Sequence, residues 1–370
     1  MLVGGVIYAE GLKRSALMVV GPRRNYGVWV RSLEGSKIVL EAAEPHQGIG
    51  HPGTLGLYWE GGYGRVGRVE EVVALRVTRS FELVAGDPPP ICIEGSLEDC
   101  PPVDLEAYAF PSDPGDAGLD FEETTYISPL GPMGAWKVPG PEARLAVHVH
   151  GWTAERREAI RLLPTLHAAG ITSLVIDYRN DPGAPRDPSG RYRFGQTEWE
   201  DVEAAAGMAL GQGAEDLILV GYSTGAAHIM AFLERSELAS KVKGVVFDSP
   251  NISLVEAIRY GSQGATYPAT PFRIGHLTRE VGLWIADVRW SVGWEATNYV
   301  ERAEAILGVP TLVFHGTADR RIPISVSRRL EALAPDQVQL VETPAAGHVM
   351  SWNADPERYE RYLRNFLDSL

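Results

Sequence analysis

The sequence has few cysteines, few cations and no long apolar run, and each scarcity excludes a class of protein. Only two of the 370 residues are cysteine, too few for a disulfide framework or a cysteine-ligated metal site. Lys and Arg number 34 against 48 Asp and Glu, a formal net charge of −14, which disfavours binding to the phosphates of nucleic acids. No apolar run approaches the roughly 18 residues that span a bilayer.

The cysteines and the first residues bear on the cellular compartment. Cys92 and Cys100 lie in a Pro-rich stretch, and two free thiols in a reducing cytosol are favoured over a single local disulfide, although both alternatives stay open. The apolar segment Met1 to Ile7 lacks the basic region and cleavage site of a signal peptide. It would also fit the remainder of a removed membrane anchor. We expect a cytoplasmic protein, and the oligomeric state stays open.

Three regions with different residue patterns divide the chain. Residues 1–86 contain short apolar and alternating runs separated by Gly, Pro and Asn, and they predict a β-rich domain without a convincing helical period. Residues 87–118 are rich in proline and predict a linker. Across residues 119–370 apolar strands alternate with helices, which predicts an α/β fold with a mostly parallel sheet and helices on both faces. Residues 251–307 break this alternation and predict a helical cap.

The strongest local motif is Gly221-Tyr222-Ser223-Thr224-Gly225. An apolar strand precedes it and a helical segment follows it. A strand-to-helix turn this tight imposes strained dihedral angles on the serine and requires small neighbours, which the two glycines supply. Such a turn lifts the serine to the edge of the sheet at a helix N-terminus. An ordinary Gly-rich turn is the alternative, but the flanking pattern favours Ser223 as a nucleophile.

A serine hydroxyl is a weak nucleophile and requires an adjacent base. Of the nine histidines, His348 lies between the last predicted strand and the final helix, where a loop at the sheet edge reaches the serine. His228 lies one turn into the helix after the serine and is expected to be packed, while His150 ends a strand and would support a loop. His46 and His51 lie far away in the β-rich region. We therefore predict that His348 is the base.

The third member of such a site is an acid at the end of a neighbouring strand. Asp319 follows the predicted strand Val309 to His315, and its loop is adjacent in sequence to the loop of His348. Asp248 also ends a strand and competes for this role. Loop adjacency favours Asp319, and we expect Asp248 to cap the segment that follows it.

Acyl transfer also requires hydrogen-bond donors for the developing oxyanion. One expected donor is the backbone N–H of Thr224, the residue after the nucleophile. The other is the backbone N–H of Trp152, because Gly151 permits a turn after the strand that ends at His150. A plain strand end is the alternative at this second position.

Five motifs in a fixed order resemble the signatures of the α/β-hydrolase superfamily, in particular its serine esterases and lipases. They are His150-Gly151-Trp152, Asp177-Tyr178-Arg179, the serine motif, His315-Gly316 with Asp319, and Gly347-His348. The resemblance covers about residues 119–370. It implies an α/β-hydrolase fold and the same nucleophile, acid, base and oxyanion donors. The loop after Arg179 is longer than the family pattern, and the N-terminal β-rich region lies outside it.

The predicted function is hydrolysis of a small carboxylic ester through an acyl-enzyme, with no metal and no organic cofactor. A serine peptidase or amidase similar to the prolyl oligopeptidases is the nearest alternative, since those enzymes also place a β domain before the hydrolase domain. The β-rich region is too short for a propeller and shows no blade repeat. A non-catalytic binding protein on the same fold is the third alternative.

Overall fold

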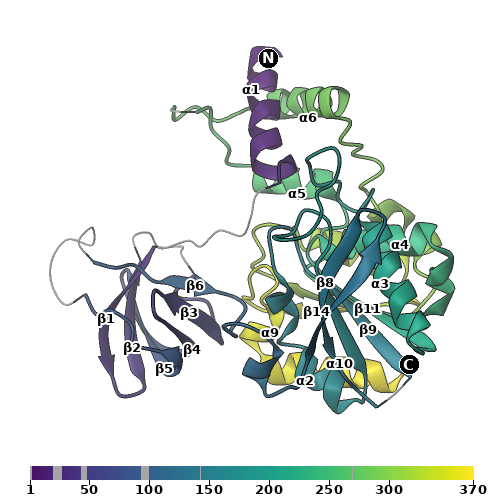
Figure 1. Ribbon diagram of the computed structural model, residues 1–370. Helices are drawn as coiled ribbons and strands as arrows, with labels where there is room; N and C mark the ends of the chain where they lie inside the picture. Colours follow the sequence, from purple (N-terminus) through teal and green to yellow (C-terminus); the bar gives the residue numbers. More distant parts are fainter. Residues whose placement is uncertain (1, 20–26, 43–47, 93–99, 142, 269) are drawn as a thin grey trace.

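The chain forms two β-sheets that lie side by side, with a pair of helices above the larger sheet (Figure 1). The computed structural model describes residues 2–19, 27–42, 48–92, 100–141, 143–268 and 270–370. All statements below concern these residues.

The smaller sheet has six strands in the order β1-β2-β5-β4-β3-β6, and each neighbouring pair is antiparallel. Alternate side chains are buried, such as Val28 and Val30 of the first strand and Ile38 and Leu40 of the second. The period of two gives this sheet one apolar face and a core of its own. The strands are β1 (Val28–Glu34), β2 (Lys37–Ala42), β3 (Leu55–Trp59), β4 (Gly62–Val73), β5 (Arg76–Gly86) and β6 (Asp104–Glu106).

The larger sheet has eight strands in the order β14-β13-β12-β11-β9-β10-β8-β7. The neighbours from β14 to β10 are parallel, whereas β8 pairs antiparallel with both β10 and β7. The carboxyl ends of the parallel strands therefore meet at one edge. The strands are β7 (Glu122–Ser128), β8 (Gly131–Val138), β9 (Arg144–Val149), β10 (Thr172–Ile176), β11 (Asp216–Tyr222), β12 (Val242–Asp248), β13 (Thr311–Gly316) and β14 (Val338–Thr343).

Helices cover both faces of the larger sheet, as the sequence predicts for apolar parallel strands. Along β11, Leu217 and Leu219 pack toward one helical layer, whereas Ile218 and Val220 pack toward the other. The first layer contains α3 (Trp199–Gly211), α4 (Gly225–Arg235), α7 (Ala303–Ile306) and α8 (Ser325–Leu333). The second contains α2 (Leu163–Ala168) and α10 (Pro356–Asp368). The predicted α/β architecture is confirmed.

The segment 251–307 is helical, as expected of a cap, with α5 (Leu254–Gly261) and α6 (His276–Trp290) as its longer helices. The expectation of β structure at the start of the chain is wrong, because residues Leu2–Leu12 form helix α1, which packs along α6 (Figure 1). The two backbones approach closely: a Cβ on Gly282 would lie 2.9 Å from the carbonyl oxygen of Gly5. Because α1 is apolar on nearly all sides, its sequence has no amphipathic period to reveal a helix.

The Pro-rich stretch and the two cysteines also differ from expectation. Strand β6, which lies in the Pro-rich stretch predicted to be a linker, pairs with β3 and extends the smaller sheet. Cys92 and Cys100 form a disulfide, which corrects the expectation of two free thiols. Within the described ranges, no helix has both the length and the apolar character needed to cross a bilayer.

The disulfide is expected to stabilise the protein by restricting the unfolded chain. A bridge across a sequence separation of 8 residues corresponds to about 2–3 kcal/mol of unfolding free energy in the chain-entropy description. Chemical denaturation with and without a thiol reductant should show this loss. The double variant Cys92→Ser/Cys100→Ser is the control and should not respond to reductant. Two titratable thiols in the unfolded, unreduced protein would contradict the bridge.

Candidate active site

The predicted nucleophile lies in a turn that few residue types permit. Strand β11 ends at Tyr222 and α4 begins at Gly225, so only two residues separate them. Ser223 has a φ of +49°, in the left-handed region that costs energy for any residue with a side chain. A Cβ on Gly225 would overlap the carbonyl oxygen of Val149. Only glycine therefore allows α4 to start against β9, and the turn brings Ser223 to the carboxyl edge of the sheet.

The structure brings the three predicted side chains, Ser223, His348 and Asp319, into one hydrogen-bonded row. The Ser223 hydroxyl lies 2.8 Å from Nε2 of His348, and Nδ1 of His348 lies 2.7 Å from Oδ2 of Asp319. They follow β11, β14 and β13, respectively, whose carboxyl ends share an edge of the sheet. In open α/β sheets, ligands bind at this edge.

The Asp319 carboxylate is buried, and the protein provides it with several hydrogen bonds. Burial alone would raise its pKa, but hydrogen bonds from His315 and His348 outweigh burial and hold the pKa well below its usual value. The second oxygen, Oδ1, accepts hydrogen bonds from the backbone N–H groups of Arg321 and Ile322, at 2.8 and 2.9 Å. Asp319 is therefore a fixed negative charge directly behind the His348 ring.

Asp248, the competing acid, has a different environment. Its carbonyl oxygen accepts the backbone N–H of Ser223 at 2.9 Å, and the Ser249 hydroxyl lies 3.2 Å from its Oδ1. Burial raises the pKa of Asp248 to about 6. Among the described residues, its side chain forms no hydrogen bond to His348. We expected Asp248 to cap the segment that follows it, but it does not cap the next helix. Asp248 supports the serine turn through its backbone.

The two backbone N–H groups predicted to bind an oxyanion are not used in hydrogen bonds among the described residues. Within the part of the chain that the structure describes, neither Trp152 N–H nor Thr224 N–H has a hydrogen-bond acceptor. The loop of Trp152 lies against the serine: a Cβ on Gly151 would lie 3.1 Å from the Cβ of Ser223. Thr224 directly precedes α4, whose N-terminus carries a partial positive charge.

The orientation of the Trp152 N–H is fixed by its own peptide group. The carbonyl oxygen of Gly151 lies 3.0 Å from Nδ1 of His150 and accepts hydrogen bonds from the Tyr178 hydroxyl and the Ala154 N–H, at 3.1 and 3.2 Å. In a planar trans peptide, the carbonyl of one residue and the N–H of the next point in opposite directions. Anchoring the carbonyl therefore directs the Trp152 N–H the other way.

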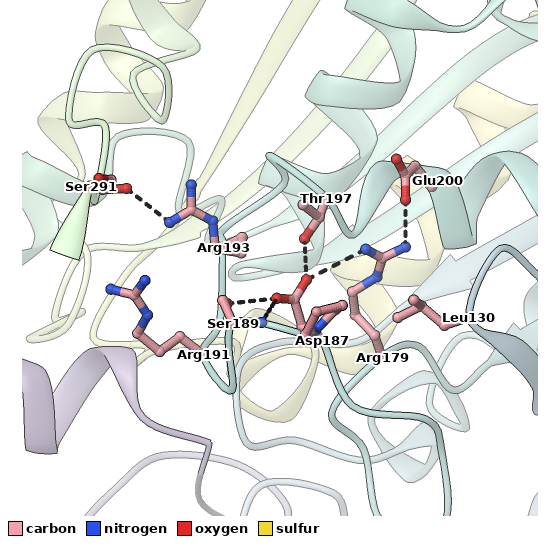
Figure 2. A pocket seen from close by; sticks show the side chains of 10 residues that line it. Leu130, Arg179, Asp187, Ser189, Arg191, Arg193, Thr197, Glu200 and Ser291 are labelled. Atoms are coloured by element: carbon pink, nitrogen blue, oxygen red, sulfur yellow. Dashed lines mark hydrogen bonds and ion pairs between the residues drawn. The ribbon is translucent and has the colours of Figure 1, made fainter.

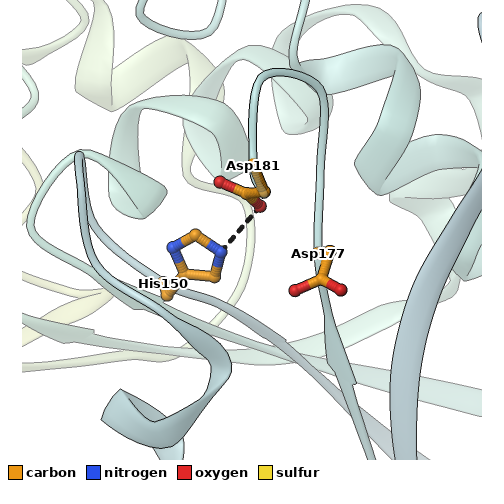
Figure 3. Close-up of side chains that lie close together, drawn as sticks. All are labelled: His150, Asp177 and Asp181. Carbon is orange, nitrogen blue, oxygen red and sulfur yellow. Dashed lines mark hydrogen bonds and ion pairs between the residues drawn. The ribbon is translucent and has the colours of Figure 1, made fainter. Parts of the chain in front are cut away.

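The buried His150 also belongs to a cluster with the half-buried Asp177 and Asp181 (Figure 3). Its Nε2 lies 2.9 Å from Asp181, while its Nδ1 faces the Gly151 carbonyl. Burial opposes ring protonation, but the charge of Asp181 outweighs it and raises the pKa of His150 to about 9. Both ring nitrogens therefore face oxygen atoms, and Arg156 forms an ion pair with Asp177 at 3.1 Å. Because contacts within the protein engage His150 and both carboxylates, these three side chains do not present a free set of metal ligands.

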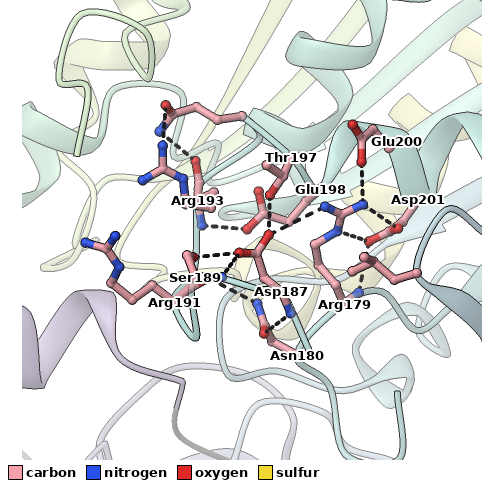
Figure 4. A network of polar contacts seen from close by, with 12 residues as sticks. Arg179, Asn180, Asp187, Ser189, Arg191, Arg193, Thr197, Glu198, Glu200 and Asp201 are labelled. Atoms are coloured by element: carbon pink, nitrogen blue, oxygen red, sulfur yellow. Dashed lines mark hydrogen bonds and ion pairs between the residues drawn. The ribbon is translucent and has the colours of Figure 1, made fainter. Parts of the chain in front are cut away.

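A second polar network holds the long loop between β10 and α3 (Figures 2 and 4). Arg179 forms ion pairs with Glu200 and Asp201 of α3, at 2.8 and 2.7 Å. Arg191 and Arg193 donate hydrogen bonds to backbone carbonyls at the C-terminal end of α6, at 2.6 and 2.8 Å. A cavity of about 500 Å³ lies among these side chains. The network ties the loop to the cap.

The cap packs against the loop that carries Trp152. Trp152 packs edge-on against Tyr192, with ring centroids 6.1 Å apart, and lies against a buried cluster that includes Phe194, Leu254 and Val292. The Tyr260 hydroxyl at the end of α5 donates a hydrogen bond to the Asp319 carbonyl at 3.1 Å. The cap therefore contacts both the loop of Trp152 and the loop of Asp319.

The other histidines considered as bases fall into different positions. His228 is buried and packs edge-on against Tyr178 at 4.8 Å, as expected. His46 lies outside the described residues. His51, which appeared remote in sequence, accepts a hydrogen bond from the backbone N–H of Gly347 at 3.0 Å. Asp181 and Tyr178 were also missed as site residues, and only the Asp-Tyr-Arg motif pointed toward their loop.

Comparisons with known proteins agree with this fold. A profile described as "Alpha/beta hydrolase family" matches residues 146–361. Among curated proteins, the uncharacterized protein YfhR of Salmonella typhimurium is 23% identical over 290 residues, covering 73% of this chain and 87% of that protein. The uncharacterized protein Rv2307c of Mycobacterium tuberculosis is 27% identical over 223 residues, covering 58% and 68%.

Solved structures share the fold. The esterase Pf2001 of Pyrococcus furiosus superposes with a TM-score of 0.54 at 18% identity, covering 70% of this chain and 96% of that one. Est1E of Butyrivibrio proteoclasticus, solved with ferulic acid bound, has a TM-score of 0.50 at 17% identity, covering 66% and 98%. At these identities the likeness supports the fold alone.

The raised pKa of His150 predicts a pH-dependent stability. The folded protein keeps the His150 proton up to a pKa of about 9, whereas an ordinary histidine loses it near 6.5. The unfolding free energy that this raised pKa contributes is fully present below pH 6.5 and is lost as the pH rises through about 9. Denaturant unfolding of wild type should therefore show a falling free energy between these values. Asp181→Asn should flatten that slope, and an unchanged slope would contradict the buried imidazolium.

Proposed function

This chain belongs to the alpha/beta hydrolase family, and from that premise we propose that it is a serine hydrolase that cleaves carboxylic esters. Ser223 is the nucleophile, His348 the general base and acid, and Asp319 the carboxylate that orients the imidazole. The observation that carries the proposal is the continuous row from the Ser223 hydroxyl through His348 to Asp319, with separations of 2.8 and 2.7 Å.

The geometry supports acylation of the serine. Ser223 Oγ attacks the acyl carbon while its proton passes to Nε2 of His348. The Asp319 carboxylate stabilises the imidazolium that forms, and its low pKa keeps it ionised while it does so. The new oxyanion accepts hydrogen bonds from the N–H groups of Trp152 and Thr224, which have no other acceptor among the described residues.

Collapse of this intermediate breaks the ester bond, and His348 donates its proton to the departing alcohol. Water then attacks the acyl-enzyme, with His348 accepting a proton from the water, and the same N–H groups stabilise the second oxyanion. The acid leaves and the Ser223 hydroxyl is restored. The protein's own residues supply each proton transfer and each oxyanion hydrogen bond in this cycle.

The Trp152 side chain packs against a buried apolar cluster that includes Tyr192, Phe194 and Leu254, and its indole nitrogen has no hydrogen-bond partner among the described residues. The fold neighbours from Pyrococcus and Butyrivibrio, an esterase and a protein with bound ferulic acid, are consistent with a small ester substrate.

A cytoplasmic location is not part of the proposal. Disulfides are uncommon in reducing cytosol, and Cys92 and Cys100 are bridged. The location that two free thiols suggested therefore loses its support.

Reaction with a fluorophosphonate probe tests the nucleophile. We expect one probe molecule per chain at Ser223, and Ser223→Ala should lower kcat by about 10⁴- to 10⁶-fold while the protein remains folded. Rates on p-nitrophenyl esters of increasing chain length and on the corresponding anilides then separate an esterase from an amidase or peptidase. An unlabelled wild type, or a Ser223→Ala variant with more than about a tenth of wild-type activity, would refute the assignment.

The two buried aspartates provide a matched pair for the acid. Asp319→Asn should lower kcat by roughly 10³- to 10⁴-fold with KM nearly unchanged, because the amide cannot stabilise the imidazolium. Asp248→Asn removes a carboxyl that lacks a bond to His348, so we expect nearly wild-type kcat and an altered thermal midpoint. Steady-state kinetics and thermal unfolding of both variants check this. A dead but folded Asp248→Asn beside an active Asp319→Asn would reverse the assignment.

A further inference from the structure

The loop that carries His348 has a strained backbone. Ala345 and Val349, which flank His348 in the loop after β14, have φ values of +57° and +52°. Such left-handed conformations cost of order 1–3 kcal/mol each for non-glycine residues and persist only where surrounding contacts hold them. The position of the His348 ring therefore depends on whatever fixes residues 344–350.

Part of that support comes from the smaller sheet. Nε2 of His51, in the segment between β2 and β3, accepts the backbone N–H of Gly347 at 3.0 Å. Gly347 directly precedes His348. Accepting this bond requires a neutral imidazole with its proton on Nδ1, and burial lowers the pKa of His51 to about 4. His51 is therefore an acceptor throughout the neutral range.

A second contact lies on the other side of His348. Met350 packs against the core of the smaller sheet, which contains Leu55 and Leu57. Three residues further on, Asn353 exchanges two hydrogen bonds with Thr54: the Thr54 N–H donates to the Asn353 carbonyl at 2.8 Å, and Asn353 Nδ2 donates to the Thr54 carbonyl at 2.6 Å. The smaller sheet and the segment that precedes β3 thus contact the His348 loop at Gly347 and Met350, and the chain just beyond it at Asn353.

The His51 segment is itself rigid because a buried arginine anchors it. The Arg79 side chain of β5 is fully buried and donates hydrogen bonds to the carbonyl oxygens of Ile49 and Gly53, at 2.8 and 2.5 Å. It also donates to the Gly67 carbonyl of β4 at 2.7 Å. These bonds connect the segment around His51 to the central strands of the smaller sheet.

We propose that the smaller sheet contributes to the active site through His51. His51 is a positioning residue that holds the His348 loop in its reactive geometry. The proposal rests on the proposed function. His51 touches neither Ser223 nor a substrate, and it acts through the Gly347 peptide. The rest of the chain also holds this loop: Val349 N–H donates to the Ser249 hydroxyl and Arg161 donates to the Val349 carbonyl, at 2.9 and 2.8 Å. Ala318 N–H also donates to the Ala346 carbonyl at 3.0 Å.

Three substitutions at His51 separate the hydrogen bond from mere packing. Glutamine places a carbonyl oxygen near the position of Nε2, asparagine is too short to reach it, and leucine fills the space without an acceptor. We expect His51→Leu and His51→Asn to lower kcat by about 10- to 100-fold, since small misplacements of catalytic groups have effects of this size. KM should be nearly unchanged, and His51→Gln should retain most of the wild-type kcat. His167→Leu, at an exposed histidine bonded to the Pro139 carbonyl, is the matched control and should behave as wild type.

Each rate is divided by the number of active sites titrated with the fluorophosphonate probe, so that unfolded protein does not count as slow enzyme. If kcat per titrated site is unchanged in His51→Leu and His51→Asn, the contact is only structural and the proposal is overturned. If His51→Gln is as slow as His51→Leu, the hydrogen bond does not hold the loop, and the proposal is overturned as well.

Hydrogen exchange gives a readout that does not depend on activity. The Gly347 amide should exchange faster in His51→Leu than in wild type or His51→Gln, while amides in β9 and β11 stay protected. Unchanged exchange at Gly347 would overturn the positioning role even if the protein is an active esterase. Faster exchange at Gly347 in a wild-type protein that neither labels nor hydrolyses esters would instead show that the proposed function failed and the loop contact did not.

Discussion

The structure depends first on the turn at Ser223, where a central strand becomes a helix within two residues. That turn is possible only because Gly225 lets α4 start against the Val149 carbonyl, and it leaves Ser223 with a φ of +49°. The same close approach places the loop of Gly151 beside the serine. The positions of the proposed nucleophile and of one proposed oxyanion donor therefore follow from one steric constraint, and β9 and β11 must be neighbours for either to form.

Three titratable groups around the turn, Asp319, His150 and His51, have pKa values that favour one protonation state each at neutral pH. Asp319 stays ionised because two histidines and two backbone N–H groups bind it. His150 is held as an imidazolium by Asp181, whereas burial keeps His51 neutral. These three groups differ in charge: an anion, a cation beside the Gly151 carbonyl, and a neutral acceptor for the Gly347 N–H. His348, mostly buried between Ser223 and Asp319, is the group to which the proposed mechanism assigns proton transfer.

The parts of this arrangement that sequence could predict are those encoded locally. The serine turn needs small residues at fixed offsets, and the acid and base loops each follow an apolar strand, so Ser223, Asp319 and His348 could all be placed from the sequence. Helix α1 could not, because it is apolar on nearly every side and gains its stability from α6, more than 260 positions away in the printed chain. The disulfide could not either, since two cysteines in a Pro-rich stretch fit both states.

His51 shows most clearly why the remainder escaped prediction. Its partner, Gly347, lies 296 positions away, and the bond uses a backbone N–H, which leaves no trace in residue type. Nothing in the sequence around His51 indicates a functional role. In the structure, however, it bonds to Gly347, the residue directly before His348. A loop with two left-handed residues, Ala345 and Val349, has little intrinsic reason to hold a single conformation. His51 on one side and Ser249 and Arg161 on the other hold that conformation, so a region that lies outside the hydrolase fold supports the loop of the proposed base.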